Sequence, residues 1–327
     1  MTDPRRTSSP TSVLVADIGG TNTRVALASG GRVARDTIRR YANAEAAGLP
    51  DILGAYLAEM GARCAGACVA AAGPVQNGVA EMTNLDWVIT PDDVRRATGA
   101  ATVAILNDLQ AQGHALDRLA PDSLRQVLPG VAHPRPGSRL VVGVGTGFNA
   151  APVHRTATGI LVAASECGHQ SLPLRSEADL RLARHVEDAH GFAGIEDVLS
   201  GRGLERLYGW RATEAGQTAS LAAVDIVARI GDGSDPVALA TAQTFVTLLG
   251  RVVGDLALVH LPFEGIYLIG GVARAFTPYL APMGFGAAFR DKGRFSSLVD
   301  EFPVHIIEDD YAALQGCASH LASVMGG

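Results

Sequence analysis

The sequence predicts an α/β protein of two lobes, and three observations lead to this prediction. Short apolar runs typical of buried strands alternate along the chain with longer stretches of helical spacing. Residues 13–28 and 139–153 both consist of an apolar run, a glycine-rich turn and a second apolar run, which indicates an internal duplication. A chain of 327 residues is long enough to bury two such cores.

The first of these stretches, VLVADIGGTNTRVALA, has the features of a phosphate-binding turn. Its two apolar runs are too short for helices and rich in strand-forming residues, so we expect a hairpin. Gly19 and Gly20 leave the N–H groups of the turn accessible to a ligand, and Asp17 at the strand end can hold a hydrated Mg²⁺. An ordinary hairpin in which Asp17 only shapes the turn fits the same residues.

Further elements of the first lobe follow from spacing and turn chemistry. The apolar residues of 44–60 have helical spacing, Asn77-Gly78 is a hairpin turn sequence, and Thr90 precedes a proline and two acids as a helix N-cap. In order, we expect a strand at 32–41, a helix at 44–60, a strand at 66–72, a hairpin at 75–82, a helix after Thr90 and a strand at 102–106 that stops at Asn107-Asp108.

A proline-rich loop at 129–137 precedes the second lobe, whose hairpin contains the turn Gly145-Thr146-Gly147. Gly270-Gly271 follow a strand and begin a helix, whose free N–H groups suit a nucleotide. Neither hairpin turn has the Gly-x-Gly-x-x-Gly spacing or leads directly into a helix, which excludes a Rossmann fingerprint.

The remaining elements that we expect are a strand at 161–164, helices at 176–190, 195–208, 219–230 and 236–261, strands at 265–269 and 303–307, and a helix at 309–324.

Composition excludes several classes of function. The net charge of −6 argues against a nucleic-acid-binding surface. We expect no apolar stretch of transmembrane length, and residues 1–11 have no apolar core, so we expect a cytoplasmic protein with a loose polar tail. The sole lysine, Lys292, precedes a glycine near the chain's end, which excludes a standard P-loop and a protein-kinase fold and argues against a Schiff-base lysine.

The four cysteines do not form two pairs with zinc-ligand spacing. Cys64 and Cys68 lie in one apolar segment, whereas Cys167 and Cys317 are far apart in the chain. We therefore expect reduced thiols and no cysteine-based metal site.

Taken together, the motifs resemble those of the bacterial ATP-dependent glucokinases in identity and order, over residues 13–322. The motifs are Asp17-Ile18-Gly19-Gly20-Thr21-Asn22, Met82-Thr83-Asn84, Asn107-Asp108, Gly145-Thr146-Gly147, Glu166-Cys167-Gly168-His169, Leu199-Ser200-Gly201, Gly270-Gly271 and the stretch 291–295. The resemblance implies a two-lobed actin-like ATPase fold with ribonuclease H-like duplicated domains and an interlobe cleft. Residues 12–112 with about 309–327 would form the smaller lobe, and 113–308 the larger.

The resemblance also implies ATP and Mg²⁺ as the phosphoryl donor, glucose as the acceptor in the first step of glycolysis, and a homodimer. Asp108 matches the catalytic base, and Asn107, Asp108, Glu166 and His169 match the sugar ligands. The matching ATP contacts are Ala16, Asp17, Ile18, Gly19, Gly20, Thr21, Asn22, Gly145, Thr146, Gly147, Gly270 and Gly271, with Asp17 also holding Mg²⁺ through water. From the residues alone, Asp108 also fits a turn or helix cap, and Glu166 with His169 fits a local pair or half of a metal site.

One departure concerns the sugar site. The family usually has a further Glu in a Glu-x-Gly triplet, and the aligned residues are Ala189-His190-Gly191, with Glu187 and Asp188 upstream as candidate substitutes. A broader kinase for mannose or fructose therefore remains an alternative to strict glucose specificity.

Two further alternatives use the same fold. A sugar-responsive regulator would need a DNA-binding helix-turn-helix, for which the N-terminal tail has no room. An actin-like or chaperone-type ATPase would not need the sugar ligands. The related ROK sugar kinases carry a zinc-binding cysteine cluster, which this chain lacks.

Overall fold

The computed structural model describes residues 12–82, 85–131, 137–157 and 159–326. The chain divides into two compact units: unit 1 comprises Met1–Ala120 and Asp309–Gly327, and unit 2 comprises Pro121–Glu308. The first boundary thus falls after Ala120 and not after residue 112, because α3 (Asp108–Ala115) and η3 (Leu116–Arg118) pack against the C-terminal helix α11 (Ala312–Gly326) of unit 1. Thr83 and Asn84, two residues of the Met82-Thr83-Asn84 motif, lie outside the described residues.

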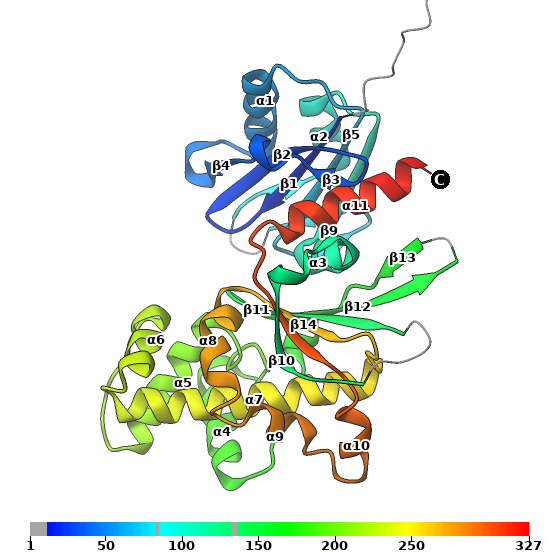
Figure 1. Cartoon of the computed structure of the whole chain (residues 1–327). Coiled ribbons are helices and arrows are strands. Elements are labelled where there is room, and N and C mark those ends of the chain that lie inside the picture. The colour runs from blue at the N-terminus through cyan, green and yellow to red at the C-terminus, as the bar shows by residue number, and fades with distance from the viewer. Residues whose placement is uncertain (1–11, 83–84, 132–136, 158, 327) are drawn as a thin grey trace, which may run out of the picture. The chain divides into compact units, whose positions relative to one another are not determined.

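The described residues of unit 1 form a six-stranded sheet in the order β3-β2-β1-β5-β9, with β4 also paired to β2 (Figure 1). The expected hairpin is confirmed, since β1 and β2 are antiparallel, and β1, β5 and β9 run parallel. The strands are β1 (Val13–Ile18), β2 (Asn22–Ser29), β3 (Arg32–Val33), β4 (Arg39–Ala42), β5 (Gly66–Ala71) and β9 (Thr102–Asn107), and a small separate sheet holds β6 (Val75–Gln76), β7 (Val79–Glu81) and β8 (Val88–Ile89).

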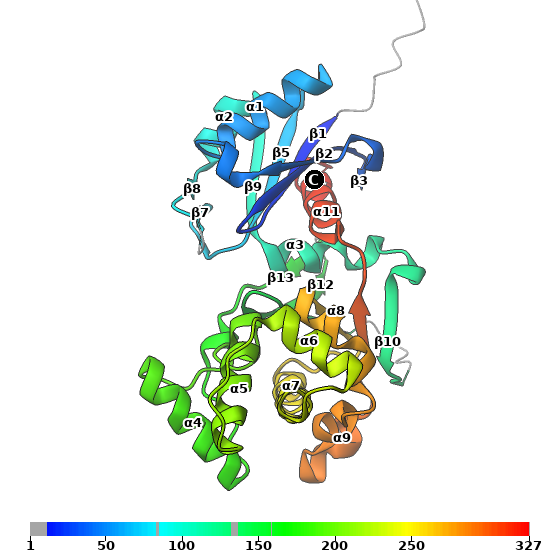
Figure 2. The ribbon, with the colours of Figure 1, turned by 90° about the vertical axis from the view of Figure 1, so that its left-hand side faces the viewer.

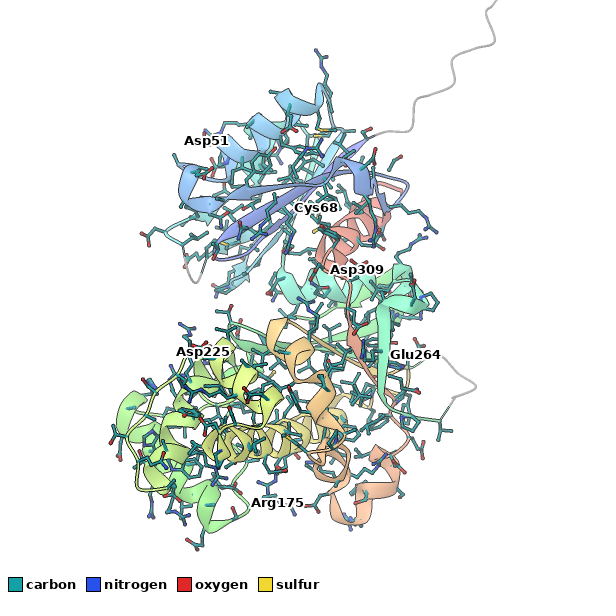
Figure 3. All side chains as sticks on the ribbon, turned by 60° about the vertical axis from the view of Figure 1, so that its left-hand side comes forward. Asp51, Cys68, Arg175, Asp225, Glu264 and Asp309 are labelled. Atoms are coloured by element: carbon teal, nitrogen blue, oxygen red, sulfur yellow. The ribbon has the colours of Figure 1, made fainter. Side chains whose placement is uncertain are left out.

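The two faces of the unit 1 sheet are covered by different helices. Leu14, Ala16 and Ile18 of β1 face the core under α1 (Leu49–Met60) and α2 (Pro91–Thr98). The alternate residues Val13 and Val15 belong to the core under α3 and α11. This second core includes Cys68 of β5, which Figure 3 shows beside α11. Asp17 follows Val15 by two residues and therefore lies on the α11 side of the sheet.

The described residues of unit 2 form a second six-stranded sheet in the order β10-β15-β14-β11-β12-β13. Its strands are β10 (Leu124–Leu128), β11 (Arg139–Val144), β12 (Phe148–Thr156), β13 (Gly159–Val162), β14 (Ile266–Ile269) and β15 (Val304–Ile307). Its helices are α4 (Glu177–His190), α5 (Gly201–Glu214), α6 (Ala223–Asp232), α7 (Pro236–His260), α8 (Gly271–Leu280), α9 (Phe285–Arg290) and α10 (Ser296–Val299). Figure 2 shows α7 nearly end-on, with its neighbours α5, α6 and α9 around it.

The two sheets repeat one strand arrangement, as the sequence duplication predicts. In unit 1 the antiparallel hairpin β1-β2 lies beside the parallel strands β5 and β9. In unit 2 the antiparallel hairpin β11-β12 lies beside the parallel strands β14 and β15. Each hairpin turn therefore lies at the edge where the parallel strands of its own unit end.

Two of the differences from the sequence prediction are explained by hydrogen bonds to side chains. The expected strand 32–41 is interrupted: η1 (Arg35–Thr37) separates β3 from β4, and the hydroxyl of Thr37 accepts the N–H of Leu27 at 3.0 Å. The expected helix 195–208 begins only at Gly201, because Ser200 caps it by accepting the N–H of Gly203 at 3.0 Å. The residues before Ser200 therefore lie outside the helix and form a turn.

Helix α7 corrects the expectation that no stretch has transmembrane length. By its 25 residues and its composition it could span a membrane, but 67% of its most apolar window is buried within unit 2, which is the burial of a core helix. Lys292 packs against it and donates from Nζ to the carbonyl of Arg251 at 2.9 Å and to Asp255 at 2.5 Å. The sole lysine of the sequence therefore has a structural role.

Candidate active site

In unit 1 the parallel strands bring the candidate residues to one edge of the sheet. Ile18 pairs with Ala71, and Ala71 pairs with Asn107, so the carboxyl ends of β1, β5 and β9 form one row. Asp17, the turn at 19–22 and the Asn107-Asp108 pair therefore lie at the same edge, where open α/β sheets bind their ligands. Ala16 and Ile18 are fully buried, so their side chains support the turn and cannot contact a nucleotide.

Asn43 holds the first glycine-rich turn in place. This buried residue of η2 (Asn43–Glu45) donates from Nδ2 to the carbonyl of Gly19 at 2.8 Å and accepts the hydroxyl of Thr23 at 2.7 Å. Its own N–H donates to the carbonyl of Thr21 at 2.9 Å. Because the C=O and N–H of a trans peptide point in opposite directions, fixing the Gly19 carbonyl on Asn43 turns the Gly20 N–H away from it. Asn43 was not singled out from the sequence.

Asp17 is paired with a cation inside unit 1. Its Oδ2 lies 3.2 Å from Nη1 of Arg24, which comes from the opposite strand of the hairpin. Burial raises the pKa of Asp17 above its ordinary value, and the neighbouring Arg24 acts in the opposite direction. One carboxylate at a strand end suits Mg²⁺, which keeps several waters and takes its other ligands from phosphates.

Asn107 and Asp108 form the junction between β9 and α3. Asn107 is the N-cap: its Oδ1 accepts the N–H of Gln110 at 2.6 Å, and the Gln110 side chain accepts the N–H of Asn107 at 3.2 Å. Asp108 is the first residue of the helix and accepts the N–H of Leu109 at 2.8 Å. Asn107 thus caps α3 through its Oδ1 atom. The part of its side chain that can donate a hydrogen bond to a ligand hydroxyl is the Nδ2 group.

In unit 2 three glycine-rich segments converge. The N–H of Gly201, at the start of α5, donates to the carbonyl of Gly145 at 2.8 Å. Gly270 has φ +110°, and a Cβ there would lie 2.4 Å from the carbonyl oxygen of Val144, so only glycine fits before α8. The turn 145–147 therefore lies against the N-terminal ends of two helices, an arrangement suited to phosphate groups.

Glu166 and His169 come from one tight turn. Glu166 precedes η5 (Cys167–His169), and the N–H of His169 donates to the carbonyl of Glu166 at 3.1 Å. Residues three apart in a 3₁₀ turn lie on the same side, and both side chains are exposed. The carboxylate of Glu166 accepts the side-chain amide of Asn149 at 3.1 Å.

The structure adds Glu196, a residue that the sequence analysis did not assign to the site. Its carboxylate accepts the N–H of Phe148, next to the turn 145–147, at 2.8 Å. Its own N–H donates to the carbonyl of Gly168, in the turn of Glu166 and His169, at 2.8 Å. Glu196 therefore connects the phosphate-type turn with the Glu166 turn, and its place just before Leu199-Ser200-Gly201 is the signal that could have identified it.

The triplet Ala189-His190-Gly191 forms the C-terminal end of α4. Ala189, Glu187 and Asp188 are exposed in the last turn of α4, which Gly191 ends with φ +77°. The carboxylate that contacts the turn 145–147 belongs instead to Glu196, whose backbone N–H binds the turn of Glu166.

Among the described residues, no group of three or more His, Cys, Asp or Glu side chains could hold a metal ion. The interpretation of Glu166 and His169 as half of a metal site therefore lacks the other ligands. The four cysteines are buried free thiols, and burial raises the pKa of Cys64 and Cys167.

Comparison with known proteins gives one consistent family. The family model described as Glucokinase matches residues 14–324. The chain is 34% identical over 311 residues to a glucokinase of Mesorhizobium japonicum, covering 94% of this chain and 91% of that one. It is 35% identical over 312 residues to a glucokinase of Chromobacterium violaceum, covering 94% and 89%. The solved structure of a glucokinase from an Antarctic psychrotroph matches with a TM-score of 0.84 at 30% identity, over 96% of this chain and 99% of the other.

Proposed function

Because the chain belongs to the glucokinase family, we propose that it transfers the terminal phosphoryl group of ATP to the 6-hydroxyl of glucose, releasing ADP and glucose 6-phosphate. One observation carries the proposal most directly. Glu166, His169 and Glu196 are held together in unit 2 beside a glycine-rich turn, which combines sugar-hydroxyl partners with a phosphate-type turn.

The backbone supplies the phosphate contacts in this proposal. The sole lysine is used structurally, so the phosphates depend on N–H groups, hydroxyls and the N-termini of α5 and α8. Thr21 and Thr146, exposed in their respective turns, add hydroxyl donors. Glycine at these turns lets the backbone approach a phosphate closely.

Asp17 is the candidate residue for Mg²⁺, held through water. The ion would neutralise phosphate charge and hold the phosphates in position for transfer. Arg24 orients the carboxylate at 3.2 Å, and a nearby cation favours the charged form that burial opposes.

Asp108 is the proposed catalytic base. A sugar hydroxyl is a weak nucleophile, so a positioned carboxylate takes its proton as the bond to phosphorus forms. The junction of β9 and α3 fixes Asp108 through the cap on Asn107. Glu166 and Glu196 accept hydrogen bonds from sugar hydroxyls, and His169 and the Nδ2 group of Asn107 can donate them.

The test is ADP release from Mg·ATP by the purified full chain with glucose, mannose, fructose, N-acetylglucosamine or no sugar. We expect turnover to depend on glucose, with glucose 6-phosphate as the product. Comparable rates with several hexoses would make the protein a broader hexokinase. ADP release that does not depend on sugar would refute the proposal and favour an actin-like ATPase without a small acceptor.

A further inference from the structure

Asn149, the second residue of β12, is the centre of a polar network that no step described above uses. Its Oδ1 accepts the N–H of Cys167 at 3.1 Å and the hydroxyl of Ser165 at 3.1 Å. Its Nδ2 donates to the carbonyl of Ser165 at 2.5 Å and to Oε2 of Glu166 at 3.1 Å. One side chain therefore binds three consecutive residues of the segment that carries Glu166.

The network determines the orientation of the amide. The carbonyl of Ser165 and the carboxylate of Glu166 need a donor, whereas the N–H of Cys167 needs an acceptor. The amide of asparagine supplies both the donor and the acceptor. Aspartate has the same shape but offers no donor, and it would place a second carboxylate against Glu166.

The segment is also fixed next to Asn149. A Cβ at Gly168 would lie 2.0 Å from the carbonyl oxygen of Phe148, so the turn of Glu166 packs directly on the backbone of β12. Phe148 thus packs against the backbone of this turn, whereas Asn149 binds the segment by hydrogen bonds and also contacts the carboxylate of Glu166. Glu166 is otherwise an exposed, flexible side chain, which loses rotamer freedom when it binds a ligand.

We propose that Asn149 is a positioning residue for sugar binding: its amide holds Oε2 of Glu166, so that Oε1 is presented to a sugar hydroxyl. This rests on the proposed function, in which Glu166 is a sugar ligand. Because β12 begins directly after the turn 145–147, Asn149 also ties the position of Glu166 to the strand that carries the phosphate-type turn.

The test compares N149A and N149D with the wild-type chain. Loss of a hydrogen bond to a charged group weakens binding by about 10- to 100-fold. We expect the Kd and KM for glucose to rise about tenfold in N149A and further in N149D, while the KM for ATP changes less than about twofold. A proportional loss for both substrates, or unchanged glucose binding, would overturn the proposal. If N149A does not fold, the same binding measurements are made on N149D, whose side chain has the same shape as that of the wild type.

The E166Q background supplies the decisive comparison. In the double variant, the amide introduced by E166Q can donate to the carboxylate introduced by N149D, which restores a hydrogen bond between the two positions. N149D should therefore weaken glucose binding much less in the E166Q background than in the wild type. Equal losses in both backgrounds would show that Asn149 does not act through Glu166.

S165A is the matched control, because it removes the hydroxyl contacts to Asn149 and to the carbonyl of Ala150 and leaves the Glu166 contact in place. We expect near-normal glucose affinity; a loss like that of N149A would mean a general structural role and overturn the proposal. A wild-type chain without glucose-dependent turnover would instead count against the proposed function itself.

Discussion

At the scale of single residues, two buried or half-buried side chains account for the shape of the site, and neither belongs to a recognisable motif. Asn43 fixes the first turn through Gly19 and Thr23, and Glu196 joins two turns of unit 2. Both form hydrogen bonds to groups that are close only in the folded chain, so local spacing does not predict these contacts, although Glu196 could have been noticed by its place just before Leu199-Ser200-Gly201.

Replacing Asn43 by Ala should weaken ATP binding selectively. The substitution removes the donor to the Gly19 carbonyl and the acceptor for Thr23, so the Gly20 N–H is no longer held in one orientation. We expect the KM for ATP to rise about tenfold and the Kd for glucose to change less than about twofold. N43D, which keeps only the acceptor, should behave similarly. Steady-state kinetics check this, and equal changes for both substrates would count against it.

Replacing Glu196 by Gln should weaken glucose binding, whereas A189E should not alter it. Gln keeps an acceptor for the Phe148 N–H but removes the charge that strengthens hydrogen bonds from sugar hydroxyls. We expect the KM for glucose to rise about 10- to 100-fold in E196Q. Ala189 is exposed at the end of α4, so a carboxylate there should leave the KM unchanged. The reverse pattern would restore position 189 as the sugar determinant.

At the scale of elements, α3 links Asp108, the proposed base, to the core of unit 1. Its N-terminus carries Asp108, and its body packs against α11 through Ala111, Leu314 and Cys317. The rings of His114 in α3 and His320 in α11 lie 4.5 Å apart, and burial is the main reason that both have lowered pKa values. The packing that fixes Asp108 therefore depends on two neutral imidazoles.

Acid should destabilise this packing. Burial, with a contribution from His320, lowers the pKa of His114 from 6.5 to about 4. Between these values the unfolded chain binds a proton at His114 and the folded chain does not, so the free energy of unfolding falls as the pH falls. The loss from His114 should reach about 3 kcal/mol near pH 4. Urea unfolding at several pH values should show a shallower dependence in H114F; identical slopes would contradict the assignment.

At the scale of the whole molecule, the duplication is what the sequence predicted best. Both hairpins and the strands beside them were expected from short apolar runs and glycine turns, because buried strands and turn residues are local signals. The interruption of the strand 32–41 by η1 was missed because it depends on a contact outside the segment, the N–H of Leu27 donated to Thr37. The helix at 236–261 was expected, but its transmembrane length was not, and its apolar residues are explained by burial. The residues of the candidate site fall into the same two groups. Asp17 and Asp108 could be predicted because they lie at strand ends, whereas the position of Glu196 depends on tertiary packing.

The variant D108N tests whether Asp108 removes the proton from a bound sugar. Asn at this position can still accept the N–H of Leu109, so α3 should begin as before. Single-turnover phosphorylation and glucose binding would be measured on the same preparation. We expect a rate at least ~10²-fold lower than that of the wild type with glucose binding retained. A near-normal rate would show that Asp108 is not the base.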